Sequence, residues 1–247
     1  MSDYICGRWA IQEALQQEAT RVSKVFLSSK LRGPSVDEIE KLAKEKGIVV
    51  QKTHDRDLDR RAAGGVHQGM VAEVLAKPPM EFREFLDSLS GVEKPGPVVL
   101  LDGIEDPQNL GAILRSAAFF GAAGVIVPKR RSAQPTPLVA KISSGGIEQV
   151  SVIQVANIAE SIEALKKEGF WVAGADAGTG EKLEKLEGSK IALVIGSEGA
   201  GMGRLVKERC DFLVKIPTKS KMGPASLNAS CAAAVLLYVA TRTAVSS

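Results

Sequence analysis

The spacing of apolar and polar positions predicts a small α/β unit in the first 76 residues. Apolar residues at helical spacing predict helices over 8–18, 36–46 and 55–63, and short apolar runs predict strands over 22–27, 48–50 and 69–75. Ser35 can cap the second of these helices, and Gly47 can end it.

Proline and glycine then mark a connector. Residues 77–79 are Lys-Pro-Pro and residues 95–97 are Pro-Gly-Pro, with a short helix expected over 81–89. Such residues concentrate at domain boundaries. The sequence therefore predicts an N-terminal domain over 1–76, a linker over 77–96 and a C-terminal domain over 97–247.

From residue 98 onward, continuous apolar strands alternate with helices, which is typical of a parallel sheet that is covered on both faces. Strands are expected over 98–101, 125–127, 171–173, 191–195 and 212–214, and helices over 110–120, 158–167 and 225–241. The predicted fold class is α/β. Because ligands bind such sheets beyond the carboxyl ends of the strands, the segments that follow the strands are the candidate site.

Composition argues against several kinds of site. The 247 residues include 2 His, 3 Cys, 2 Trp, 2 Tyr and 7 Phe, and no two cysteines are spaced as CxxC. This scarcity disfavours a zinc knuckle, a His-rich metal site, a Ser-His-Asp triad and an aromatic platform that stacks bases. We expect His67 to be structural. The 24 glycines match neither the P-loop nor GxGxxG, since Arg204 stands where the third glycine is needed.

Charge is nearly balanced but clustered. Residues 1–94 carry 15 basic and 15 acidic groups, whereas residues 95–247 carry 17 and 14 and supply the whole net charge of +3. Three basic clusters stand out: residues 129–131; Lys215, Lys219 and Lys221; and Arg56, Arg60 and Arg61. Such clusters can bind phosphates, and they can equally be solvated surface.

The location of the protein can also be predicted. The longest apolar run, 231–240, is far shorter than the roughly 18 residues of a membrane span. The first residues lack the pattern of a signal peptide, and three cysteines fit a reducing compartment. We therefore expect a cytoplasmic protein with no membrane segment.

The segment after the predicted strand 98–101 carries a single guanidinium among very small residues. Asn109 is placed to cap the following helix, and Arg115 lies six residues further on, beside Gly111, Ala112 and Ala118. Small neighbours allow the close approach of a backbone, a partner helix or a substrate. A phosphate suits the planar fork of an arginine, and a structural carboxylate would satisfy it as well.

Two further segments follow later strands. Residues 196–203 hold four glycines around Glu198, and such a loop lets a ligand lie against the backbone. Glu198 could face a cation, orient Arg115 or accept a hydroxyl proton, or it could be a solvated residue in a flexible turn. Ser226 and Asn228 lie near the start of the last predicted helix and are, by themselves, most simply helix caps.

Taken in this order, the three segments resemble the three motifs of the SpoU or TrmH family, which are S-adenosylmethionine-dependent RNA ribose 2′-O-methyltransferases of the SPOUT superfamily. The matching stretches are NLGAILR from residue 109, LVIGSEGAGM from residue 193, and IP and SLNAS from residues 216 and 226. This resemblance covers 97–247. The stretches YICGRWAIQEAL, GVHQGMVAEV and VPKRRSAQ are similar to family members that methylate a guanosine in 23S rRNA.

The resemblance implies a trefoil knot in the C-terminal domain, an N-terminal RNA-binding domain and a homodimer. It implies S-adenosyl-L-methionine as the cofactor and no metal, with the cofactor bound in the knot by Gly196, Ile216 and Leu227. The catalytic residues that it implies are Asn109, Arg115, Glu198, Ser226 and Asn228. Residues 218–225 depart from the family pattern, because this stretch is longer and contains two lysines and a proline.

The implied reaction is 2′-O-methylation of a guanosine ribose in 23S rRNA. Because an arginine is hard to deprotonate, Arg115 is expected to orient the hydroxyl and stabilise the oxyanion. Glu198 and Asn109 would hold Arg115 and the knot loops, and Ser226 and Asn228 would shape the substrate side. Two alternatives stay open, a tRNA guanosine 2′-O-methyltransferase and a non-catalytic RNA-binding factor of ribosome assembly.

Overall fold

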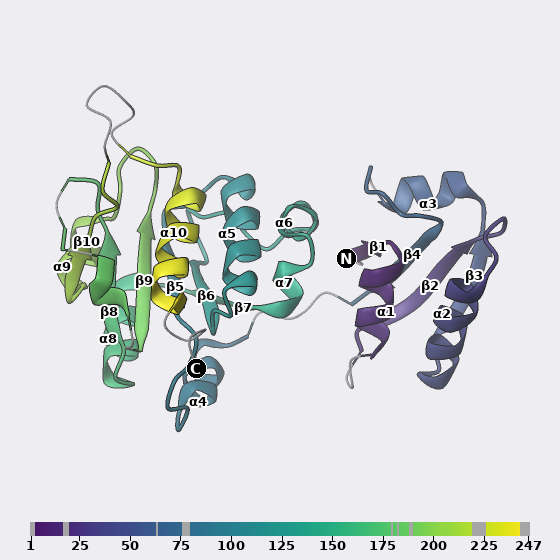
Figure 1. The fold of residues 1–247 in the computed structure, drawn as a ribbon, viewed down its shortest axis with the longest axis horizontal. Helices are drawn as coiled ribbons and strands as arrows, with labels where there is room; N and C mark the ends of the chain where they lie inside the picture. Colours follow the sequence, from purple (N-terminus) through teal and green to yellow (C-terminus); the bar gives the residue numbers. More distant parts are fainter. Residues whose placement is uncertain are drawn as a thin grey trace. The chain divides into compact units, whose positions relative to one another are not determined.

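The computed structural model describes residues 3–16, 20–62, 64–75, 80–178, 180–181, 183–187, 190–218 and 226–242. The chain divides into two compact units, Met1–Pro78 (unit 1) and Pro79–Ser247 (unit 2). Figure 1 shows that each unit has its own sheet and its own helices.

Unit 1 is built on four strands in the order β1-β4-β2-β3. Its elements are β1 (Asp3–Cys6), α1 (Arg8–Gln16), β2 (Val22–Ser28), α2 (Pro34–Glu45), β3 (Val49–Thr53), α3 (Asp55–Ala62) and β4 (Met70–Val74). β2 pairs in parallel with β3, and β4 pairs antiparallel with both β1 and β2. Helices α1 and α2 pack on one face through Ile11 and Ile39, and α3 packs on the other through Leu58.

Unit 2 is built on six parallel strands in the order β10-β8-β9-β5-β6-β7. The strands are β5 (Val98–Asp102), β6 (Gly124–Pro128), β7 (Ser151–Val155), β8 (Trp171–Ala175), β9 (Ile191–Gly196) and β10 (Phe212–Val214). The helices are α4 (Phe82–Leu89), α5 (Pro107–Phe119), α6 (Pro137–Ser143), α7 (Gly146–Gln149), α8 (Ile158–Lys167), η1 (Leu183–Leu186), α9 (Arg204–Arg209) and α10 (Ala229–Thr241).

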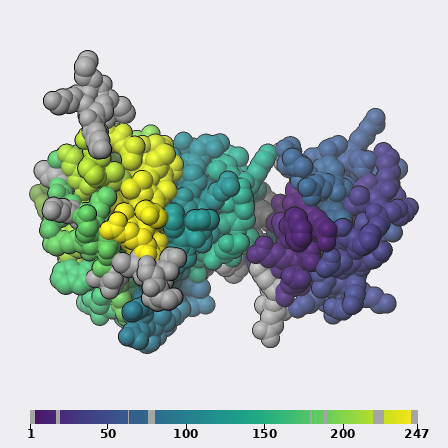
Figure 2. Space-filling view, viewed as in Figure 1, coloured from purple at the N-terminus to yellow at the C-terminus, as the bar shows by residue number. Residues whose placement is uncertain are grey.

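Successive residues of the central strands face two separate cores, which explains why these strands are apolar throughout. Val99 and Leu101 of β5 join the core under α5, α6 and α10, whereas Val98 and Leu100 join the core under α4, α8 and α9. On the first face α10 packs beside α5, and both contribute to the surface of unit 2 (Figures 1 and 2).

The predicted linker 77–96 contains a packed helix. Phe85 and Leu89 of α4 are buried in the same core as α8 and α9, so the described part of this segment belongs to unit 2. The spacing of Phe85 and Leu89, four residues apart, indicates a helix. It does not indicate which domain core the helix packs against. The bounds of the two domains stay a prediction.

The predicted α/β class, the parallel sheet and the small N-terminal α/β unit are all confirmed. The knot stays a prediction, because residues 219–225, most of the stretch that departs from the family pattern, lie outside the described residues. None of the described helices is long and apolar enough to cross a membrane.

Candidate functional site

The prediction that Asn109 caps α5 is wrong. Asp106 is the cap, since its side chain accepts a hydrogen bond from the backbone N–H of Gln108 at 2.8 Å, and Pro107 occupies the first turn. A proline suits that position because no helical partner exists there for an N–H. Asn109 therefore lies inside the first turn, with 9% of its surface exposed, and its amide is free for other partners.

Asn109, Glu198 and Asn228 form a hydrogen-bonded trio. Asn109 Nδ2 donates to Glu198 Oε1 at 2.9 Å, and Asn228 Nδ2 donates to the same oxygen at 2.5 Å. Asn228 Nδ2 also donates to Asn109 Oδ1 at 2.9 Å. Each residue comes from a different one of the three segments singled out above, so the fold brings all three segments to one point.

The start of α10 fixes how the amide of Asn228 is oriented. Asn228 Oδ1 accepts bonds from the backbone N–H groups of Ser230 at 2.9 Å and Cys231 at 3.3 Å. An amide oxygen that is held by donors turns its NH₂ group the other way, here toward Glu198. Asn228 is thus both a helix cap and a member of the trio.

Glu198 is presented by a tight glycine turn. Ser197 and Gly201 exchange two backbone hydrogen bonds, at 3.0 and 2.9 Å, and close the turn around Glu198. A Cβ at Gly196 would lie 2.2 Å from the carbonyl carbon of Gly201, so only glycine fits there. Gly203 N donates to Asp102 Oδ2 at 2.7 Å and ties this segment to the end of β5.

A cavity of about 800 Å³ opens beside Glu198. Its lining includes the three predicted cofactor residues, Gly196, Ile216 and Leu227, together with Ser226. The segment 175–178 at the end of β8 and Lys215 after β10 complete the wall. Residues 175–178 are not among the predicted site residues, although this glycine-containing segment also follows a strand at the carboxyl edge.

Arg115 lies outside this arrangement. Its side chain is exposed, its Nη1 is 3.5 Å from Ser144 Oγ, and it is not among the described residues that line the cavity. The described residues show no hydrogen bond from Arg115 to Glu198 or Asn109, so the expectation that these two hold Arg115 is wrong within this chain. Both bond instead with each other.

The small residues near Arg115 serve helix packing. A Cβ at Gly111 would lie 2.5 Å from Cγ2 of Ile142, at the contact of α5 with α6. A Cβ at Gly146 would lie 2.9 Å from the Cα of Arg115, at the contact of α5 with α7. The small residues beside Arg115 could have allowed a backbone, a partner helix or a substrate to approach closely. The structure shows closely packed helices there.

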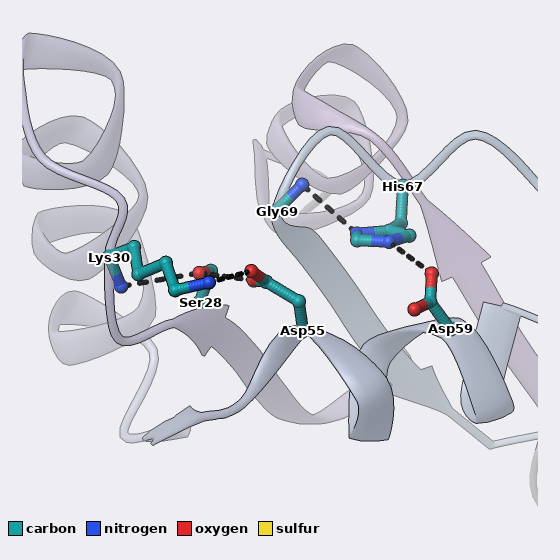
Figure 3. Close-up of polar contacts among 6 residues, drawn as sticks. All are labelled: Ser28, Lys30, Asp55, Asp59, His67 and Gly69. Carbon is teal, nitrogen blue, oxygen red and sulfur yellow. Dashed lines mark hydrogen bonds and ion pairs between the residues drawn. The ribbon is translucent and has the colours of Figure 1, made fainter.

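His67 is held by structural contacts in unit 1 (Figure 3). Its Nδ1 accepts from the backbone N–H of Gly69 at 3.0 Å, so in the neutral ring Nε2 carries the proton and donates to Asp59 at 3.0 Å. In the same view Asp55 accepts from Ser28 at 2.5 Å and from Lys30 at 3.0 Å, and these bonds lower the pKa of Asp55.

The basic cluster in α3 is partly neutralised inside unit 1. Arg60 pairs with Asp57 at 2.7 Å, and Arg61 lies 4.2 Å from the ring centre of Phe26 while it donates to the carbonyl of Asp57. Arg56 is exposed. Of the second cluster, Lys219 and Lys221 lie outside the described residues. Within the described part of the chain no three His, Cys, Asp or Glu side chains are grouped as metal ligands would be.

Two protein-family models match the chain. The model described as the SpoU rRNA Methylase family matches residues 96–238, and the model described as RNA 2′-O ribose methyltransferase substrate binding matches residues 4–80. A curated Bacillus subtilis protein, YacO, which is assigned to the TrmH family of tRNA/rRNA methyltransferases, is 41% identical over 240 residues, covering 96% of this chain and 94% of its own.

Solved structures share the fold. The AdoMet-bound rRNA methyltransferase of Sinorhizobium meliloti aligns with a TM-score of 0.78 at 20% identity, covering 98% of this chain and 87% of its own. The SpoU methyltransferase AviRb of Streptomyces viridochromogenes, in complex with AdoMet, aligns with a TM-score of 0.75 at 23% identity, covering 99% and 91%.

Proposed function

This chain belongs to the SpoU rRNA methylase family, and from that membership we propose that it transfers the methyl group of S-adenosyl-L-methionine to the 2′-hydroxyl of a guanosine ribose in 23S rRNA. Such an enzyme is of the RlmB type. The observation that carries the proposal is the trio of Asn109, Glu198 and Asn228 beside a cavity of about 800 Å³.

The cavity fits the cofactor in size and chemistry. Small-molecule pockets are typically about 300–1,000 Å³ and are mainly apolar with a few polar groups. Ile216 and Leu227 offer apolar surface for an adenine ring, and Gly196 with the glycine turn packed against it forms part of the cavity wall. When bound, S-adenosyl-L-methionine supplies a methyl group on a sulfonium.

The residues of this chain would align the ribose and stabilise the negative charge that develops on its 2′ oxygen. Arg115 is exposed, so a substrate can reach it, and a guanidinium stays protonated and can stabilise the developing oxyanion. The Asn109, Glu198 and Asn228 bonds hold the loops that flank the cavity, and Ser226 and Asn228 would shape the substrate side. Such positioning turns the transfer between two bound reactants into an effectively unimolecular step.

An rRNA substrate is favoured over tRNA by the first unit. The substrate-binding model covers 4–80, and unit 1 is a compact α/β body with its own core. The alternative of a non-catalytic RNA-binding factor is disfavoured because Asn109, Glu198 and Asn228 are all present and bonded together.

We further propose a homodimer in the cytoplasm. Phe119 of α5 is 83% exposed and Tyr238 of α10 is 56% exposed, and Phe120 contacts both rings. Exposed aromatic residues on two packed helices are typical of an interface. A second copy of the chain would cover them.

Labelled S-adenosyl-L-methionine tests the choice of substrate. The full chain is incubated separately with 23S rRNA and with bulk tRNA that lack the modification, and the label in each RNA is counted. We expect label in 23S rRNA. Label confined to tRNA would favour the tRNA methyltransferase. No label in either RNA would favour the non-catalytic RNA-binding factor.

A further inference from the structure

Three adjacent cations at residues 129–131, here called the cation loop, follow β6 and are exposed. In the described part of the chain their side chains have no ion-pair or hydrogen-bond partner. Elsewhere in unit 2, Lys166, Lys207 and Arg209 are paired with carboxylates at 2.8, 2.6 and 2.8 Å. The cation loop therefore presents concentrated positive charge that the protein does not neutralise.

This loop is held in a defined shape. Gln134 Nε2 donates to the carbonyls of Pro128 at 3.1 Å and Ser132 at 2.9 Å, and Gln154 Nε2 donates to Gln134 Oε1 at 2.5 Å. Arg131 has a φ of 53°, a left-handed conformation that few non-glycine residues adopt. A mobile surface loop would not need these bonds, and strained residues tend to cluster at functional sites.

The cation loop leaves the sheet at the same edge as the trio. β6 pairs in parallel with β5, and β5 with β9, so their carboxyl ends lie side by side. Ala133 N donates to the carbonyl of Ile104 at 2.7 Å, which joins the segment after the cation loop to the loop that enters α5. Because the cavity lies over β8, β9 and β10, the cations and the cavity flank the trio on opposite sides.

Acidic residues limit where an anion can lie. Glu105 and Asp106 are exposed in the loop that enters α5, and Asp106 is engaged by the backbone of Gln108. Both carboxylates would repel a phosphate. The favourable path for an anionic chain is therefore over the β6 side of this edge.

We propose that the cation loop binds the phosphodiester groups of the RNA strand that carries the reacting ribose. The inference rests on the proposed function and names the surface that positions its substrate. An arginine fork can hold two phosphate oxygens, a lysine adds a compact charge, and such contacts position a strand without reading its bases. The loop would fix the register of the strand, and the base would be read elsewhere.

Matched charge-removal variants test this assignment in the full chain. Lys129→Gln/Arg130→Gln removes two charges from the cation loop, and Lys94→Gln/Lys167→Gln removes two exposed charges next to the amino ends of β5 and β8. A third variant, Arg131→Gly, removes one charge, and glycine adopts a φ of 53° without strain. Thermal unfolding checks that all variants fold.

Filter binding of a 23S rRNA transcript at several salt concentrations is the readout. Each lost contact to a single strand should lower the slope of log affinity against log salt by about 0.7, so the cation-loop double variant should lose about 1.4 and bind about tenfold more weakly. Its KM for RNA should rise while its affinity for S-adenosyl-L-methionine stays unchanged. The control double variant should match wild type.

Wild-type slope and affinity in the cation-loop variants would overturn the inference. So would unchanged RNA binding with lost binding to intact ribosomal particles, because that result would assign the loop to a protein partner. If the wild-type chain binds the transcript but methylates no RNA, the proposed function fails, and the salt slope still decides the role of the cation loop.

Discussion

At the scale of residues, the site depends on amides whose partners fix their orientation. Asn228 is held by two backbone donors of α10, so its NH₂ group can only face Glu198 and Asn109. The sequence places these residues in three separate segments and predicts that they act together. It cannot predict that Glu198 bonds with two amides instead of with Arg115, because this depends on the rotamers of the folded chain.

Arg115→Ala should lower methyl transfer to 23S rRNA by about 10²–10³-fold, because an exposed guanidinium that stabilises the oxyanion is lost. Cofactor affinity, measured by calorimetry, should not change, since Arg115 is outside the described cavity lining. Ser144→Ala, which removes the hydroxyl near Arg115, serves as the control and should stay close to wild type. Near-wild-type turnover by Arg115→Ala would remove Arg115 from the mechanism.

Cys210 should resist alkylation in the folded protein. Burial, with smaller contributions from the Asp211 and Asp102 charges, outweighs the nearby Lys166 charge and raises the pKa of Cys210 to about 11. Only the thiolate reacts. Cys231 is exposed. Iodoacetamide at a pH of about 8 should modify Cys231 first, and peptide mass spectrometry reads the sites. Equal rates at both cysteines would contradict this account, and unfolded chain should react at both.

At the scale of elements, the sequence predicts the buried central strands well and misses several short strands and helices. β5 and β9 are continuous apolar runs between glycine-containing turns, and both are found. β1, β7, α6, α7 and α9 are not predicted, because four to seven residues without a long apolar run carry too little periodicity. Their positions depend on pairing and packing with distant segments, as the α5 contacts with Ile142 and Gly146 show.

Gly146→Ala should lower the free energy of unfolding by about 1–3 kcal/mol, because the added methyl group would lie 2.9 Å from the Cα of Arg115 and the carbonyl oxygen of Leu114. Gly199→Ala is the matched control, since a Cβ there meets nothing within 4 Å. Urea unfolding of both variants measures the difference. Equal stabilities would show that α7 does not pack on α5 this closely.

At the scale of the whole molecule, the two units have separate cores, and we propose separate roles for them in catalysis and in substrate binding. Unit 2 holds the trio, the cavity and the cation loop, and unit 1 has the match to a substrate-binding model. Proline and glycine near 77–97 predict this division from the sequence. The packing of α4 on unit 2 is not predictable from the sequence, because a short amphipathic helix does not specify its partner.

Phe119→Glu should convert the proposed homodimer into a monomer, because a carboxylate would be buried in the interface without a partner. Trp171→Glu changes an aromatic residue that is 57% exposed on β8, outside helices α5 and α10, and should leave the dimer intact. Light scattering coupled to gel filtration gives the mass of each variant. A wild-type chain that is monomeric would contradict the proposal directly.

The most direct test of the central claim is the chemical identity of the product nucleoside. The full chain is incubated with labelled S-adenosyl-L-methionine and unmodified 23S rRNA, and the RNA is digested to nucleosides for mass spectrometry. The account predicts one labelled product, 2′-O-methylguanosine, whose 3′ linkage resists alkaline hydrolysis. Label on a base, on another nucleoside, or on no nucleoside would contradict it.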